Sequence, residues 1–186
     1  IAHQEGFSNV VASMGTSLTK HQAKLLQDIT QEVVLALDPD TAGQEATLRS
    51  LESSWQVLQR RVISQRRGPT LYERPQGPTL KVASLPQGMD PDEIILETPD
   101  MWEELTKNAV PLMTFMFQAL STRFDLSTSH GKSQVTEILF PLVAATPDTF
   151  EQDHHFRELA QLLGVTETTL EAAVLRRRSH KSTATS

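Results

Sequence analysis

Residues 32–37, with the sequence EVVLAL, place five apolar residues in a row directly before a polar segment. A short unbroken apolar run is typical of a strand buried on both faces, as in a parallel sheet covered by helices. Residues 9–14 (NVVASM) and 79–86 (TLKVASLP) also predict strands. Between the three runs lie helix patterns, one of which begins at Thr19 and Gln22 with capping-box spacing. The first half therefore predicts an α/β, Rossmann-like fold with a mostly parallel sheet.

The second half has a different pattern, and no strand is predicted after about residue 98. Apolar residues at helical spacing predict helices at residues 102–109, 111–123, 129–145, 148–163 and 167–178. We therefore expect a domain boundary near residues 97–100. The α/β domain would cover residues 1–97, an all-α helical subdomain residues 98–178, and a polar tail residues 179–186.

An Asp-Pro-Asp tripeptide follows two of the predicted strands and supplies Asp38 and Asp40, then Asp90 and Asp92. In extended backbone the first and third residues point to the same side, and proline favours extended backbone before it. Parallel strands bring their carboxyl ends to one edge, so we expect the four carboxylates to converge there. A divalent cation would offset their repulsion, and oxygen ligands favour Mg²⁺ or Mn²⁺. Phosphoryl or nucleotidyl transfer is the chemistry that such a site performs.

The same tripeptides also have a simpler interpretation as turns and helix caps. Asp before Pro is a common turn signal. Asp40 could cap a helix that begins at Thr41, and Asp92 a short helix that begins at Glu93. One isolated tripeptide favours the cap, whereas its recurrence after two strands of one sheet favours the metal site.

Composition and charge exclude several classes of protein. The chain has 186 residues and a formal net charge of −6, so any nucleic-acid surface must be local. It has no cysteine, which excludes disulfides and thiolate zinc sites. The sequence has neither an apolar run of membrane-spanning length nor a signal-peptide pattern. We therefore expect a cytoplasmic protein, and the start at Ile1 predicts a piece of a longer chain.

Longer stretches of the sequence resemble a known family. VVASMGTSLT, EVVLALDPDTAGQEATLRSLE and LKVASLPQGMDPDE resemble the TOPRIM catalytic core of bacterial DNA primases of the DnaG type. PLMTFMFQAL, DLSTSHGKSQVTEILFPLVA and DHHFRELAQLLGV resemble the helical subdomain that follows that core. The resemblance implies synthesis of RNA primers from ribonucleoside triphosphates on a single-stranded DNA template. It also implies Mg²⁺ or Mn²⁺ as cofactor and action at the bacterial replication fork.

The resemblance assigns roles to individual residues. Asp38 and Asp40 match the family's Asp-x-Asp metal ligands, with proline between them where the family often has glycine or alanine. Asp90 and Asp92 match its second acidic pair, so the four aspartates are the expected catalytic metal ligands. The expected turns beside the site contain three further residues, which are Gly15, Thr16 and Gly43.

One part of the family's site has no match in this chain. TOPRIM enzymes carry a catalytic glutamate in a Glu-Gly-Tyr-Met-Asp segment on an earlier strand. The segment EGFSNVV at Glu5 is similar but stands in the wrong register. We expect the family's zinc-binding, basic amino-terminal and helicase-binding domains to lie outside this chain, with zinc confined to the first. This chain alone is therefore expected to make no primers.

Basic and histidine residues offer weaker candidates. Four arginines could contact template or primer phosphates, although arginines near a helix end are also ordinary surface residues; they are Arg60, Arg61, Arg66 and Arg67. His154 and His155 are helix neighbours that diverge by about 100°. We therefore expect one to be packed and the other exposed, rather than a metal-binding pair.

Two other functions are compatible with parts of the pattern. A topoisomerase with a TOPRIM core would need a nucleophilic tyrosine, and the one tyrosine, Tyr72, falls in a loop rich in proline and glycine. TOPRIM nucleases lack the helical second half. A non-catalytic interaction module on a degenerate TOPRIM core would not need the four aspartates.

Overall fold

The computed structural model describes residues 1–12, 19–37, 51–55 and 78–183. The chain divides into two compact units, Ile1–Leu120 and Ser121–Ser186. This division falls later than the boundary predicted near residues 97–100, because the segment after residue 98 contributes a strand to the sheet of the first unit. The compact units do not test the predicted domain limits, residues 1–97, 98–178 and 179–186, which stay a prediction.

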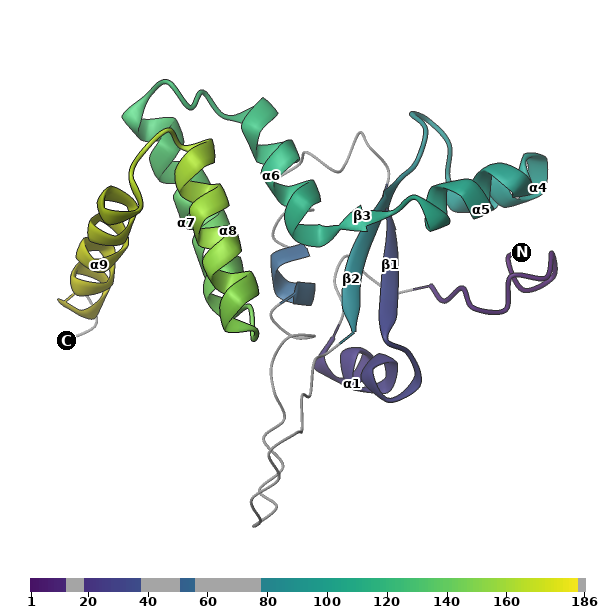
Figure 1. The fold of residues 1–186 in the computed structure, drawn as a ribbon. Coiled ribbons are helices and arrows are strands. Elements are labelled where there is room, and N and C mark those ends of the chain that lie inside the picture. The colour runs from purple at the N-terminus through teal and green to yellow at the C-terminus, as the bar shows by residue number, and fades with distance from the viewer. Residues whose placement is uncertain (13–18, 38–50, 56–77, 184–186) are drawn as a thin grey trace, which may run out of the picture. The chain divides into compact units, whose positions relative to one another are not determined.

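A small mixed sheet forms the first unit. Strands β1 (Glu32–Leu37) and β2 (Thr79–Ser84) are parallel, and they pair in register from Glu32 opposite Thr79 to Leu37 opposite Ser84. Helix α1 lies at their amino ends (Figure 1). The mostly parallel α/β sheet predicted from the apolar runs is therefore confirmed. Strand β3 (Val110–Pro111), which pairs antiparallel with β2, was not predicted.

The strand predicted at residues 9–14 is absent from the part of it that the structure describes, residues 9–12. The amino-terminal segment forms turns, in which Phe7 N–H donates to the Ala2 carbonyl at 2.9 Å. A ring nitrogen of His3 lies 2.7 Å from the Val10 carbonyl oxygen. These local hydrogen bonds satisfy polar backbone groups that a strand would pair with a neighbour. Of this run, Val10 packs against the core described below, whereas Val11 is exposed.

Local sequence signals determine where α1 (Lys20–Ile29) begins. Thr19 caps the helix with its hydroxyl, which accepts from Gln22 N–H at 3.3 Å, and the Gln22 side chain accepts from Thr19 N–H at 2.8 Å. The predicted capping box is confirmed. Further along, the described helical residues 51–55 bury Leu51 and Trp55, which stand four positions apart, as on one face of a helix.

Three helices complete the segment after β2. They are α4 (Pro91–Glu97), α5 (Pro99–Lys107) and α6 (Leu112–Arg123). Helices were predicted at 102–109 and 111–123, so α5 begins and ends earlier than expected. Residue Leu112 and the inner face of α6 are fully buried, and Arg123 lies beyond the division between the two units.

The second unit contains α7 (Ser129–Ala145), α8 (Thr149–Leu162) and α9 (Glu167–Thr183). The bounds predicted for α7 are confirmed, and α8 begins after the N-cap Asp148 as expected. Helix α9 extends into the predicted polar tail as far as Thr183. None of the helices in the described ranges is long and apolar enough to span a membrane.

Candidate metal centre

The second acidic pair begins helix α4. Asp90 has extended backbone (φ −92°, ψ 165°) and is the N-cap of the helix. Its Oδ1 accepts from Glu93 N–H at 2.8 Å, and Glu93 Oε2 accepts from Asp90 N–H at 3.0 Å. The two side chains thus satisfy two backbone donors that a helix start leaves without intrahelical partners.

Two details of the expected geometry are wrong. Asp90, not Asp92, is the cap, and the helix begins at Pro91 rather than Glu93. The pair therefore does not lie in extended backbone, because Pro91 and Asp92 already have helical conformation. Proline favours the first helical position, since its fixed φ suits the helix and its missing N–H needs no acceptor.

A buried apolar cluster holds α4 next to the parallel strands. Leu85, just after β2, packs with Ile94 and Ile95 of α4 and with Trp102 of α5. Ala36 of β1 is half-buried against the same cluster. Burial of aliphatic side chains of this size stabilises a fold by about 1.5–3 kcal/mol each. The cluster therefore joins α4 and α5 to the sheet through Leu85 and Ala36.

The turn between β2 and α4 brings the chain from the sheet to the cap. Leu85 N–H donates to the Leu37 carbonyl at 3.0 Å, which extends the parallel pairing by one hydrogen bond. Met89 N–H then donates to the Pro86 carbonyl, and Gly88 has φ 75°. Only glycine adopts such a conformation readily, so this turn depends on its missing Cβ.

The described half of the site suits a hard divalent cation. Asp90 and Asp92 are both exposed, and Glu93 adds a third carboxylate in the first turn of α4. Capping occupies one oxygen of Asp90, and a carboxylate retains further lone pairs that can bind a cation. The donor set consists of oxygens only, as Mg²⁺ and Mn²⁺ prefer.

The other expected site residues lie outside the described residues. These are the first acidic pair, the two turns and the basic group: Asp38, Asp40, Gly15, Thr16, Gly43, Arg60, Arg61, Arg66 and Arg67. Their roles stay predictions. Glu5, the residue similar to the family's glutamate, is exposed in the amino-terminal turns.

A second group of metal-binding side chains occurs on α8, in the other unit. His154, His155 and Glu158 present ligand atoms that all lie within 4.8 Å of one another. His155 Nδ1 is 3.3 Å from Glu158 Oε2. His154 is exposed and His155 retains 9% of its surface, as expected for neighbouring helix positions. The prediction did not consider Glu158, whose spacing from His154 (four residues) and from His155 (three) would have indicated the cluster.

Comparison with protein families assigns both halves of the chain. Residues 2–95 match the Toprim-like family, and residues 113–168 match the DnaB-helicase binding domain of primase. The second match lies inside the chain. The expectation that the helicase-binding domain lies wholly outside it is therefore wrong.

Individual proteins and structures agree with the family matches. The chain is 31% identical over 166 residues to a DNA primase of Clostridium acetobutylicum, covering 89% of this chain and 24% of that protein. It resembles the Escherichia coli primase catalytic core (TM-score 0.67, 30% identity, 89% of this chain, 48% of that chain). It also resembles a DnaG primase catalytic domain bound to single-stranded DNA (TM-score 0.63, 29% identity, 86% and 46%). The chain spans about a quarter of the length of the curated relatives it matches.

Proposed function

Since the chain belongs to the Toprim-like family and its second half matches a primase domain, we propose that it is a carboxyl-terminal part of the catalytic core of a bacterial DnaG-type primase. The whole protein would synthesise RNA primers from ribonucleoside triphosphates on a single-stranded DNA template. It would act in the cytoplasm, at the replication fork. This reaction is a metal-dependent nucleotidyl transfer.

A buried cluster that includes residues of α4, and against which Ala36 of β1 packs, is the observation that carries this proposal. Ile94 and Ile95 share one buried cluster with Ala36, which stands two residues before Asp38 in the sequence. Helix α4, which Asp90 caps, and β1, which the first acidic pair follows in the sequence, therefore contribute to one apolar cluster.

The four aspartates are the residues that would hold Mg²⁺ or Mn²⁺, and they are Asp38, Asp40, Asp90 and Asp92. When bound, the ion would neutralise charge on the triphosphate and favour attack by the primer hydroxyl. The hydrogen bond that Asp90 Oδ1 accepts from Glu93 N–H fixes this side chain before any ligand binds. Such a prearranged ligand loses little conformational freedom on binding.

Other residues would position the nucleic acid and the turns. We assign the turns beside the aspartates to Gly15, Thr16 and Gly43, and phosphate contacts to the arginines at 60, 61, 66 and 67. Because the chain carries a net charge of −6, these local contacts must be supplemented by basic residues elsewhere in the protein. The replicative helicase would bind through residues 113–168, the segment that matches the helicase-binding family.

The same match argues against the competing functions. In a topoisomerase or a nuclease with a Toprim-like core, we would not expect a primase helical domain to follow the core. A non-catalytic module would retain that domain but would not need the four aspartates.

Primer synthesis by the full-length protein tests the proposal. Asp38→Ala and Asp40→Ala should each lower the rate by at least about a hundredfold, since loss of groups around a metal ligand alone costs ten- to a hundredfold. Removing one carboxylate relieves repulsion, so the unfolding temperature without metal should stay level or rise. The matched control is Asp28→Ala, an exposed aspartate of α1, which should keep full activity. Variants that lose melting temperature but keep activity would show that the aspartates are structural.

A further inference from the structure

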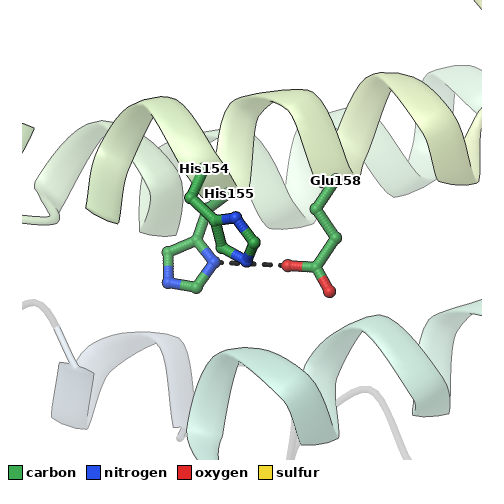
Figure 2. A group of neighbouring side chains, drawn as sticks. All are labelled: His154, His155 and Glu158. Carbon is green, nitrogen blue, oxygen red and sulfur yellow. Dashed lines mark hydrogen bonds and ion pairs between the residues drawn. The ribbon is translucent and has the colours of Figure 1, made fainter. Parts of the chain in front are cut away.

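Helix α8 gathers two imidazoles and a carboxylate at one place on its surface. Figure 2 shows the rings of His154 and His155 and the carboxylate of Glu158 on the same side of the helix. Their ligand atoms lie within 4.8 Å of one another, and His155 Nδ1 is 3.3 Å from Glu158 Oε2. Ligands of one ion at about 2.0–2.2 Å from it stand 3–4 Å apart, so small rotations of these side chains suffice.

Helix geometry explains why the two histidines meet. Successive residues are about 100° apart around the axis, so His154 and His155 alone would diverge. Glu158 follows His154 by four residues and stands about 40° from it, between the two histidines. Both rings can therefore turn inward toward the carboxylate, and the three side chains occupy a single face.

We propose that His154, His155 and Glu158 bind one Zn²⁺ ion. Two imidazole nitrogens and one carboxylate oxygen form a ligand set that zinc accepts in tetrahedral geometry, with water at the fourth position. Mg²⁺ would be a poor occupant, because it prefers a full set of oxygen ligands. Zinc was expected only in a domain outside this chain because cysteine is absent, but this ligand set needs no thiolate.

The surroundings of His155 favour this role. Its Nε2 lies 3.6 Å from Glu151 Oε1, a charge contact too long for a hydrogen bond. In the zinc-free protein Nδ1 donates to the Glu158 carboxylate, which can only accept; on zinc binding that proton would move to Nε2, which faces Glu151. Metal-binding histidines commonly have such a carboxylate at the other ring nitrogen, so Glu151 is a positioning residue.

The charges of α8 also favour a cation. The helix carries three acidic residues, Glu151, Asp153 and Glu158, against one basic residue, Arg157. The Arg157 guanidinium is 2.7 Å from Asp153 and 3.9 Å from Glu167, so its charge is engaged with other carboxylates. The proposal does not depend on the primase assignment, because it rests on α8 alone.

Calorimetric titration of the full chain with ZnCl₂ in millimolar Mg²⁺ tests the site. Magnesium occupies oxygen-only sites and leaves the histidine site to zinc. We expect one zinc per chain, and at least about tenfold weaker binding in His154→Ala and in Glu158→Gln. Both side chains are at least partly exposed, so the variants should fold as the wild type does. The matched control is His130→Ala, an exposed histidine on α7, and Asp90→Ala should also bind zinc normally.

A thermal measurement gives an independent readout. Zinc at about a hundredfold excess over its dissociation constant should raise the unfolding temperature by about 5–10 °C in the wild type, and by much less in His154→Ala. Histidine NMR signals should shift at His154 and His155 when zinc is added. Stoichiometric zinc binding that is equally tight in all variants would overturn the proposal, and so would no binding in the wild type. In the latter case the His155–Glu158 contact would serve only to stabilise α8.

Discussion

Replacing Asp90 by asparagine separates the two roles that this residue has in the proposed site. The wild-type side chain caps α4 and would also bind the metal. Asparagine caps a helix about as well as aspartate, because its side-chain oxygen accepts the same hydrogen bond from Glu93 N–H. It lacks the negative charge, however, and a neutral amide oxygen is a weaker ligand for Mg²⁺ or Mn²⁺. Alanine removes both functions.

The structure sets the magnitudes. Asp90→Ala loses the 2.8 Å capping hydrogen bond and leaves the Glu93 backbone N–H without this acceptor, at a cost of about 1 kcal/mol. For a chain of this size, that amounts to a fall in the unfolding temperature of about 2–4 °C. Asp90→Asn should lose only a few tenths of a kcal/mol, mainly from the interaction of the charge with the helix dipole. Both variants should bind Mn²⁺ at least about tenfold more weakly than the wild type.

The assay combines Mn²⁺ titration with thermal unfolding in the presence of a chelator. Asp148, the N-cap of α8, provides the matched control, because it accepts from Phe150 and Glu151 N–H at 3.0 Å and has no place in the proposed site. Asp148→Ala should lower the unfolding temperature to a similar extent and leave Mn²⁺ binding unchanged. The reasoning would be refuted if Asp90→Asn bound Mn²⁺ as tightly as the wild type, since Asp90 would then be a cap alone.

Two further predictions concern the stability of the second unit. A Cβ at Gly131 would overlap the backbone carbonyl of Asp125, with the carbonyl carbon at 2.8 Å. Gly131→Ala should therefore destabilise the protein by about 1–3 kcal/mol in urea unfolding, despite alanine's higher helix propensity. The control His130→Ala should be nearly neutral, and an equally neutral Gly131→Ala would show that the turn can move. The hydrogen bond from the Ser127 hydroxyl, and then the one from the Ser127 backbone N–H, lower the pKa of Asp125. The ionised Asp125 carboxylate therefore stabilises the folded protein above the ordinary aspartate pKa, and this stabilisation is lost as the pH falls through the lowered pKa. Asp125→Asn should therefore have a lower unfolding temperature than the wild type at neutral pH, and this difference should disappear in strong acid. A difference that stays constant with pH would show that ionisation of Asp125 does not contribute to stability.

The helix starts show what local sequence could predict. A helix cap depends on a side chain and a backbone N–H that are two or three residues apart. The caps of α1 (Thr19 with Gln22) and α8 (Asp148) could therefore be recognised without tertiary structure. The same rule applies to Asp90 and Glu93, which have the spacing of a capping box. The prediction of extended backbone there was wrong, because Pro91 is compatible with the first helical position as well as with an extended segment, and Glu93 completes a capping box.

The acidic tripeptides and the resemblance to a family were likewise visible in the sequence, since they are properties of residue order. The packing of distant segments against one another was not, because it depends on contacts between residues far apart in the chain. Ala36 and Ile94 are 58 positions apart, by subtraction of their numbers, and only packing brings them into one cluster. The cluster that α4 and β1 share therefore follows from the tertiary structure.

The sequence by itself determined the strands β1 and β2, the bounds of α7, and the identity of the candidate metal ligands, because each depends on periodicity or on residue type over a few positions. Only the tertiary structure decided that Val10 and its neighbours pack as turns and that Val110 pairs with Val82 in β3. A strand exists only when a partner accepts its hydrogen bonds, and a two-residue strand carries no periodicity of its own. The choice between strand and turn was therefore made by neighbours distant in sequence, whose positions no local pattern records.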